Sequence, residues 1–226
     1  MKKVSLFTLL LSTSFALFAQ DQPQLRTKMD VKPRFGVRGG VNLASLEIDD
    51  DYNGTPDFKT NSKTSFQLGA FVNIPLGGML RIQPELSYQG GGSKINGSLI
   101  TNTAQVEDYE LDFDYLAVPV MFQLQTNGGF FVEAGPQFAF LTTAREDRAT
   151  GTDVDIKDQE FVKKTDFALA AGLGYLSRIG LGLNARYVHG LTNVYNTERT
   201  QGNQNEREVS NRGVQIGLVY HFGAAK

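Results

Sequence analysis

The sequence predicts an all-β protein: an eight-stranded antiparallel transmembrane β-barrel with short periplasmic turns and four long extracellular loops. Three observations carry this prediction. Apolar and polar residues alternate in eight separate segments, and the connections between these segments are alternately short and long. Beyond the N-terminal region, no stretch approaches the ~20 apolar residues that a membrane-spanning helix needs. Strand side chains point in turn to opposite faces, so such alternation indicates strands with one apolar face each.

The N-terminal region predicts export. Lys2 and Lys3 precede an apolar run that extends to Ala19. The run is short for a bilayer-spanning helix and lacks the charged flank of a stop-transfer segment, which disfavours a retained membrane anchor. We therefore expect residues 1–19 to be a secretory signal peptide, cleaved near Ala19 and Gln20.

The rest of the chain divides into two parts. Residues 20–33 are polar and are expected to form a periplasmic tail, and residues 34–226 are expected to form the barrel. The formal net charge of -2 provides no basic field, so nucleic acid is disfavoured as a partner. Cysteine is absent, which excludes disulfides, thiolate metal sites and a cysteine nucleophile, and no cofactor is expected.

The predicted strands divide their residues between two faces. They span residues 35–46, 64–74, 80–88, 113–124, 130–141, 166–175, 179–191 and 213–222. In the third segment, Leu86 and Tyr88 lie on one face and Glu85 and Ser87 on the other. Each segment therefore presents an apolar face and a more polar one.

The connections favour a membrane barrel over a soluble one. Short turns lie at 75–78, 126–129 and around 177–178, and long polar connections lie near 47–63, 90–112, 142–165 and 192–212. In membrane barrels the periplasmic turns are short and the extracellular loops long. A soluble barrel has no reason to place every long loop at one end. We therefore expect the apolar faces to meet lipid, with a soluble barrel of apolar interior as the alternative.

The polar faces predict a charged lumen. The residues assigned to it are Arg38, Arg81, Glu85, Glu133, Asp166 and Arg186. Strands one and five face each other across an eight-stranded lumen, so Arg38 is predicted to meet Glu133. By the same reasoning, Glu85 is predicted to meet Arg186. An interior of eight strands is only wide enough for side chains, and buried charges must be paired. The prediction is a lumen plugged by paired charges, with a glycine-poor centre, and the alternative is a gated path for protons or small solutes.

Three prolines fall inside predicted strands: Pro84, Pro119 and Pro136. Proline removes a donor from the hydrogen-bond ladder, and a closed barrel has no edge strand on which to place it. We therefore expect a local β-bulge at each proline.

Several segments resemble one family of small barrels. They read IQPELSY at 82–88, YLAVPV at 115–120, EAGP at 133–136, ARY at 185–187 and GLVYHF at 217–222. Over residues 35–222 the chain resembles the PorT-like, or porin-family, outer-membrane barrels of Bacteroidota. The resemblance implies a last strand whose Leu218, Tyr220 and Phe222 are read by the barrel-assembly machinery. The chain departs from the family's pattern at Gln123, where a lysine is frequent, and in the four residues after Phe222. The family has no single function.

The two histidines, His189 and His221, do not form part of a predicted active site. A hydrolase of the serine–histidine type needs a serine beside the histidine. His189 has the lipid-facing parity, whereas His221 faces inward near the periplasmic end, and neither has a serine at strand or cross-strand reach. No catalytic residue is predicted, and a lipid-modifying enzyme is the least favoured alternative.

The first long loop begins like a calcium loop. Asp49, Asp51 and Asn53 occupy the first ligand positions of a D-x-D-x-N-G pattern. The twelfth position holds Thr60, where a bidentate glutamate is required. These three residues are candidate metal ligands, and a solvated acidic loop is the alternative.

A second loop segment, 106–114, alternates acidic and apolar residues. It predicts either strands that extend the barrel above the membrane or an acidic, aromatic surface for a partner.

These observations together predict a non-enzymatic protein of the Gram-negative outer membrane, with a structural or surface-binding role through its loops. The alternative is a narrow transport pore or a secretion-accessory barrel, which the resemblance implies for some relatives. The expected partners are outer-membrane lipid and lipopolysaccharide, the barrel-assembly machinery during biogenesis, and an unidentified extracellular ligand or secretion partner.

Overall fold

The computed structural model describes residues 32–49, 60–95, 109–148, 153–155, 163–193 and 208–223. The predicted signal peptide, most of the predicted tail and much of the long loops lie outside these ranges. The chain separates into two units at residue 30, and the barrel belongs to the second. No helix within the described residues is long and apolar enough to cross a membrane.

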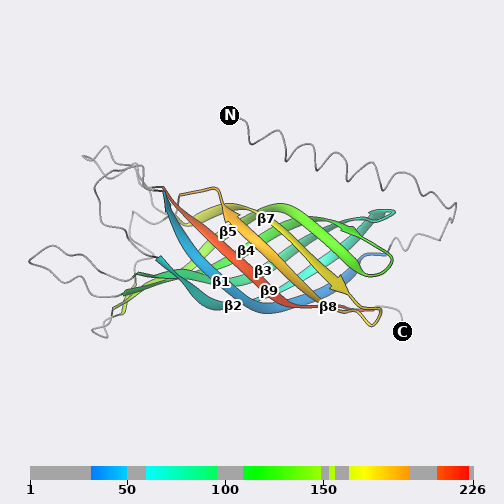
Figure 1. Cartoon of the computed structure of the whole chain (residues 1–226), viewed down its shortest axis with the longest axis horizontal. Helices are drawn as coiled ribbons and strands as arrows, with labels where there is room; N and C mark the ends of the chain where they lie inside the picture. The colour runs from blue at the N-terminus through cyan, green and yellow to red at the C-terminus, as the bar shows by residue number, and fades with distance from the viewer. Residues whose placement is uncertain are drawn as a thin grey trace, which may run out of the picture. The chain divides into compact units, whose positions relative to one another are not determined.

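The described strands close into one antiparallel barrel (Figure 1). They are β1 (Arg34–Asp49), β2 (Thr60–Gly77), β3 (Leu80–Ile95), β4 (Tyr109–Gln125), β5 (Phe130–Arg148), β6 (Asp153–Asp155), β7 (Thr165–Leu176), β8 (Leu181–Gly190) and β9 (Glu208–His221). Pairing of β9 with β1 and of β4 with β5 completes the ring, while the short β6 pairs only with the outer part of β5. Eight strands therefore form the barrel, which confirms the predicted fold class.

The short turns gather at one end of the barrel. Gly78, Gly129 and Gly180 adopt φ values of 57°, 95° and 86° in the three turns. Glycine takes this left-handed conformation without steric cost, which permits the tight reversal. At the same end, the backbone N–H of Phe222 donates to the carbonyl of Phe35 at 2.8 Å. The first strand of the barrel therefore begins at this end, and the last strand ends there.

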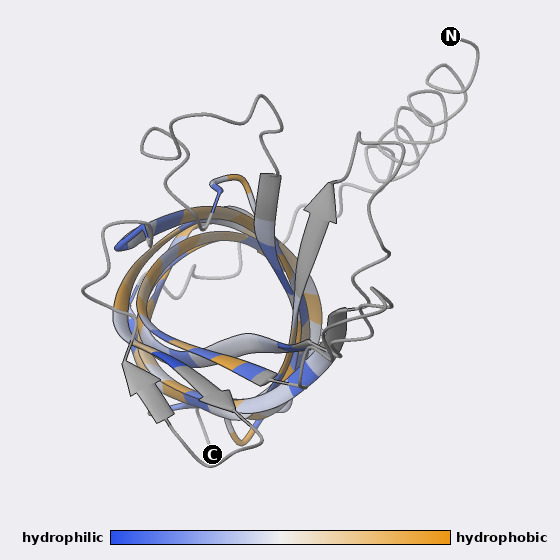
Figure 2. Cartoon of the chain, turned by 90° about the vertical axis from the view of Figure 1, so that its left-hand side faces the viewer, coloured by the Kyte–Doolittle hydropathy of each residue, from blue (hydrophilic) through white to orange (hydrophobic). Residues whose placement is uncertain are grey.

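The outward face is apolar over the height of a bilayer. On β4 the exposed apolar band runs from Leu116 to Leu124, and on the last strand it runs from Val214 to Phe222, the residue that follows β9. Both bands match the ~9–11 residues of a transmembrane strand. Figure 2 shows hydrophobic and hydrophilic residues alternating around the ring. A soluble barrel would bury this apolar face, so the lipid-facing assignment is confirmed.

The two faces exchange character above this band, on the loop side. At the outer end of β4, Leu111 and Phe113 are buried inside, whereas Glu110 and Asp112 are partly exposed. The part of β4 before Leu116 pairs with both β3 and β5. For the described residues, this confirms that the alternating segment extends the barrel above the membrane. The outer limit of the lipid-facing band on β4 lies just before Leu116.

The predicted bulges at the three prolines are wrong. Beside Pro84, Pro119 and Pro136 the ladder skips two residue pairs and then resumes in the same register. The missing donors therefore interrupt the ladder without inserting a residue. The register shifts of the described strands lie between Ser62 and Gln67, between Pro75 and Gly77, and beside Asp114. At the last of these, Thr142 is the extra residue on β5 and donates its hydroxyl to the Asp114 carbonyl at 2.9 Å.

The expectation of a glycine-poor centre is also wrong. Glycines recur at inward positions, and Gly172 pairs with both Glu133 and Arg186 at the level of the charges. Nearer the short turns, a Cβ at Gly36 would lie 2.2 Å from the ring of Phe71. Likewise, a Cβ at Gly174 would lie 2.4 Å from the ring of Phe131. Glycine leaves room for large side chains from neighbouring strands, so a few large groups fill the lumen.

Candidate functional site: an ion-pair network in the lumen

Four charged side chains meet inside the barrel. Arg38, Glu85, Glu133 and Arg186 come from inward positions of β1, β3, β5 and β8, and each of these side chains is at most 2% exposed. Alternation along each strand aims them inward, and the narrow lumen brings them within contact.

Arg186 is the centre of this network, because its guanidinium binds both carboxylates. Its Nε donates to Glu133 Oε1 at 2.9 Å, and its Nη2 lies 2.8 Å from the same oxygen. Towards Glu85 it makes a bidentate contact, with Nη1 to Oε2 at 3.0 Å and Nη2 to Oε1 at 2.8 Å. This planar two-point geometry is the strongest form of arginine–carboxylate pairing. The predicted meeting of Glu85 with Arg186 is thus present in the structure.

Arg38 binds a different partner from the predicted one. Its Nη1 donates to Glu85 Oε2 at 3.0 Å, whereas Glu133 pairs with Arg186. In the amide orientation that satisfies both of its polar atoms, Asn184 accepts from Arg38 Nη2 at 2.9 Å. Barrel strands are tilted and staggered, so residues chosen from opposite strands do not share one height in the lumen.

A layer of amides supports the carboxylates. Gln83 Nε2 donates to Glu85 Oε1 at 2.9 Å, and Gln123 Nε2 donates to Glu133 Oε2 at 2.8 Å. The Asn73 amide nitrogen donates to the side-chain oxygens of both glutamines, at 2.8 and 2.7 Å. Gln83, Gln123 and Asn73 were not predicted to be site residues, although their inward parity was the available signal. They hold both carboxylates in place without adding charge.

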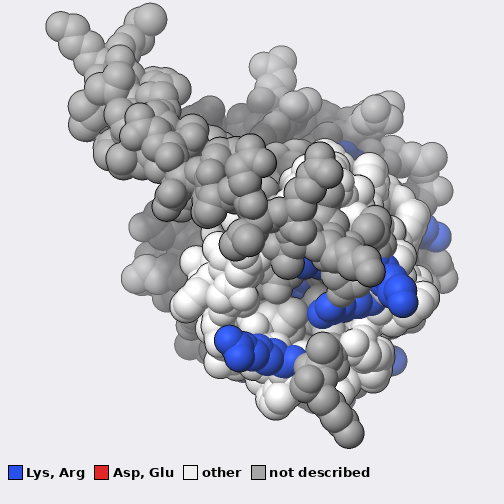
Figure 3. Space-filling model, turned by 90° about the vertical axis from the view of Figure 1, so that its right-hand side faces the viewer, with Lys and Arg blue, Asp and Glu red and all other residues white. Residues whose placement is uncertain are grey.

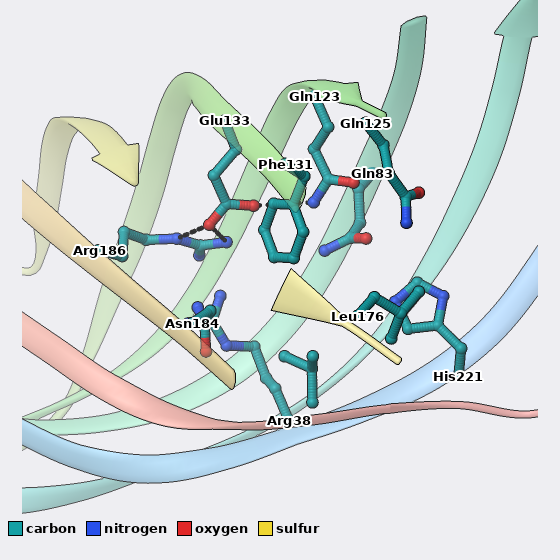
Figure 4. Close-up of a pocket in the computed structure, with 11 residues that line it drawn as sticks. Arg38, Gln83, Gln123, Gln125, Phe131, Glu133, Leu176, Asn184, Arg186 and His221 are labelled. Atoms are coloured by element: carbon teal, nitrogen blue, oxygen red, sulfur yellow. Dashed lines mark hydrogen bonds and ion pairs between the residues drawn. The ribbon is translucent and has the colours of Figure 1, made fainter. Parts of the chain in front are cut away.

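The network lies within a closed part of the lumen. Figure 4 shows Arg186 and Glu133 turned toward one another, with Arg38 and Asn184 nearby. The cavity beside these groups measures about 10 Å³, which is space for about one water molecule. The cavity at the outer mouth, lined in part by Asn42 and Gln215, measures about 50 Å³. Within the described residues, the side chains therefore fill most of the lumen.

The other two predicted lumen residues lie at opposite ends of the barrel. Arg81 is half-buried near the short turns, where its Nη1 donates to Asn73 Oδ1 at 3.2 Å. Asp166 is half-buried at the outer mouth, accepting from the Thr192 hydroxyl and, at 2.9 Å, from Asn211 Nδ2. Arg81 thus adjoins the amide layer, while Asp166 belongs to a separate polar group.

The remaining candidate residues lie outside the network. Asp51 and Asn53 fall beyond the described residues, and only the backbone of Asp49 is described. The ring of His221 packs against Phe71 inside the barrel, with centroids 4.9 Å apart. The ring of His189 stacks on Tyr187, with centroids 6.4 Å apart. In the described part of the chain, no cluster of three acidic or histidine side chains is arranged to hold a metal ion.

The last strand presents its predicted assembly residues to the lipid. Leu218, Tyr220 and Phe222 are 53%, 41% and 49% exposed on the outward face. They form the lower half of the apolar band of β9, on the short-turn side.

A second, smaller group of ion pairs lies above the membrane band. Lys94 Nζ lies 2.5 Å from Glu110 Oε1, and Lys63 contacts both Glu110, at 3.3 Å, and Asp112. The hydrogen bond from Lys94 lowers the pKa of the Glu110 carboxyl, against the opposing effect of burial and with help from Lys63. Partial burial works to lower the pKa of Lys63, but its bond to Asp112 and its contact with Glu110 outweigh this and raise it. These pairs join the outer ends of β2, β3 and β4.

An antiparallel barrel with a lipid-facing apolar shell and an ion-paired interior defines an outer-membrane β-barrel protein. The chain matches the outer membrane protein beta-barrel domain family over residues 18–196, and it belongs to that family. It is therefore a protein of the outer membrane.

Several solved barrels are similar to the chain in outline. Neisserial surface protein A is 14% identical, with a TM-score of 0.49, over 83% of this chain and 97% of that one. Ail of Yersinia pestis is 14% identical, with a TM-score of 0.44, over 84% and 99%. OprG of Pseudomonas aeruginosa is 14% identical, with a TM-score of 0.41, over 84% and 95%. No curated protein sequence matches the chain.

Proposed function

We propose that the protein is a non-enzymatic outer-membrane barrel whose lumen is closed by paired charges, and that it acts through its outer loops in a structural or surface-binding role. One observation carries the proposal. The buried network of Arg38, Glu85, Glu133 and Arg186 has two positive and two negative charges, so it is balanced without solvent ions. Desolvated charges that are paired and hydrogen-bonded are costly to separate.

A passing solute would have to break this network, because the space beside it holds about one water molecule. The extension of β2 to β5 above the band supports the second half of the proposal. It raises the starts of the long loops above the lipid surface, where a macromolecular partner or lipopolysaccharide can reach them.

The test is ionic conductance in planar bilayers. The parent protein, refolded from residue 20 onward, is compared with the double variant R38A/E133A. Removing Arg38 and Glu133 takes away one charge of each sign and leaves the bidentate pair of Arg186 with Glu85 intact. A matched control, K94A/E110A, removes an equally neutral pair outside the membrane band.

We expect negligible conductance for the parent and the control, and a measurable conductance for R38A/E133A. Heat-modifiable mobility on gels verifies that each protein has folded. A folded double variant that conducts no better than the parent would contradict the plug. A steady, ion-selective conductance of the parent would instead support the narrow transport pore.

Two finer assignments belong to the same proposal. We place the protein among the PorT-like barrels of Bacteroidota, and the support is the set of segments at 82–88, 115–120 and 217–222. We also propose cleavage after Ala19, which N-terminal sequencing of the membrane-embedded protein checks directly.

A further inference from the structure

Within the described residues, the charged side chains at the short-turn end of the barrel are all basic. Its described charged residues are Lys32, Arg34, Arg81 and Arg178, and the described part of this end has no acidic residue. Figure 3 views this end and shows lysine and arginine, with no aspartate or glutamate, on the atoms that are described. We call these four residues the basic collar.

The opposite end has the opposite charge. Among the described residues on the loop side, within 45–65, 90–115, 142–166 and 192–212, 11 are acidic and 7 are basic, a net charge of -4. The lumen network is neutral, so the charge of the barrel is separated along its axis. The charge of the barrel therefore attracts an anionic group more strongly at the short-turn end than at the loop end.

The collar lies at the depth of lipid headgroups. Arg178 directly precedes Ile179, which is 68% exposed at the edge of the apolar band, whereas Arg34 has the inward parity opposite Phe35, which is 65% exposed. A phospholipid has a phosphate at the water boundary and acyl chains deeper in the membrane. A basic side chain beside an apolar one can contact both parts: the basic group meets the phosphate and the apolar group meets the acyl chains. Basic side chains at such a boundary extend toward the headgroups.

We infer that the basic collar binds the phosphate headgroups of anionic phospholipids in the periplasmic leaflet. Lys32 and Arg178 are exposed and supply charge directly, while Arg34 and Arg81 are half-buried and add to the local potential. Each basic group near an anionic surface is worth about fivefold in association. We therefore expect anionic lipid to be enriched around the protein at least about fivefold over zwitterionic lipid at low salt. The enrichment falls toward unity at 0.5 M salt, because screening shortens the reach of the charges to about 4 Å.

The test compares two spin-labelled lipids in the shell around the full mature protein. Phosphatidylglycerol and phosphatidylcholine are measured separately, by electron paramagnetic resonance in phosphatidylcholine bilayers. The variant K32Q/R178Q removes the two exposed members of the collar. The control R145Q/K164Q removes one arginine and one lysine, both exposed, from the loop side.

We expect K32Q/R178Q to lose most of the preference for phosphatidylglycerol, and R145Q/K164Q to keep it. Both variants change only exposed side chains, and gel mobility verifies that they fold. Equal association of the two lipids with the parent would overturn the inference and point to an acidic periplasmic protein as the partner of the collar. A preference that the control variant loses, and K32Q/R178Q keeps, would overturn it as well. Neither result bears on the closed lumen, which conductance tests separately.

Discussion

Replacing Arg186 by methionine tests how far the buried network stabilises the barrel. The substitution removes every contact of the guanidinium with Glu85 and Glu133. Arg38 then faces two carboxylates, so one negative charge stays buried without a cationic partner. Breaking a buried ion pair in this way costs about 3–5 kcal/mol. We therefore expect R186M to lower the free energy of unfolding by about that amount.

A second variant separates charge balance from packing. In R186M/E133Q one charge of each sign is lost, and the pair of Arg38 with Glu85 remains at 3.0 Å. Balanced removal of a buried pair is often close to neutral, so we expect this variant to lie within about 2 kcal/mol of the parent. The single variant E133Q completes a double-mutant cycle.

The assay is urea unfolding in lipid vesicles, followed by the heat-modifiable gel mobility of the folded barrel. The reasoning predicts that E133Q rescues R186M. If R186M and R186M/E133Q are equally destabilised, the loss comes from packing around the arginine, and the network is not held by charge balance.

Three further outcomes follow from the described geometry. G40A should cost more than about 1 kcal/mol of unfolding free energy in the same assay, because a Cβ at Gly40 would lie 2.2 Å from a backbone carbonyl of β9; a neutral effect would mean that the strands separate easily. Leu218 lies at the middle of the lipid-facing band and Val214 at its outer rim. Substitution by arginine should therefore lower the free energy of unfolding in vesicles by about 2–4 kcal/mol at Leu218 and by about 0–1 kcal/mol at Val214. Equal costs at the two positions would show that the band does not lie where the structure puts it. Lys94 lowers the pKa of the Glu110 carboxyl, so this pair stabilises the protein fully above the ordinary glutamate pKa, and the stabilisation is lost as the pH falls through the lowered pKa. K94Q should therefore raise the titration midpoint of the Glu110 carboxyl, measured by ¹³C NMR. An unchanged midpoint would show that Lys94 is not the cause.

Much of the fold was predictable because strand periodicity is a local property. Alternation placed Arg38 and Glu85 inside and Leu86 outside, without knowledge of any contact between strands. The order of the strands followed from the lengths of their connections. The inner face of β4 was harder to predict from alternation, because Phe113 and Met121 are apolar yet buried inside the barrel. Over residues 115–122 both faces of this strand are apolar, so this part gives no alternation to interpret.

Which charged side chains pair inside the lumen depends on the stagger of the strands relative to one another, and this stagger cannot be read from the sequence. The predicted contact of Arg38 with Glu133 assumed equal heights for opposite strands. In the structure, Arg38 instead reaches Glu85, and Glu133 is held by Arg186 and Gln123. The prolines illustrate the same limit, because the loss of a donor is local whereas the register is set by whole strands. Composition and parity therefore predicted which groups are inside, and closure of the barrel decided which of them touch.

The exchange of faces on β4 separates two tasks along the same strand. Below Leu116 the strand is adapted to a lipid solvent, and above it Leu111 and Phe113 form a small interior of the kind found in water-soluble sheets. The long loops therefore start from a segment of the barrel whose packing does not depend on contact with lipid. Their sequences are free to diverge, or to accept inserted peptides, without disturbing the segment that the membrane must take up, which makes this end of the protein modular.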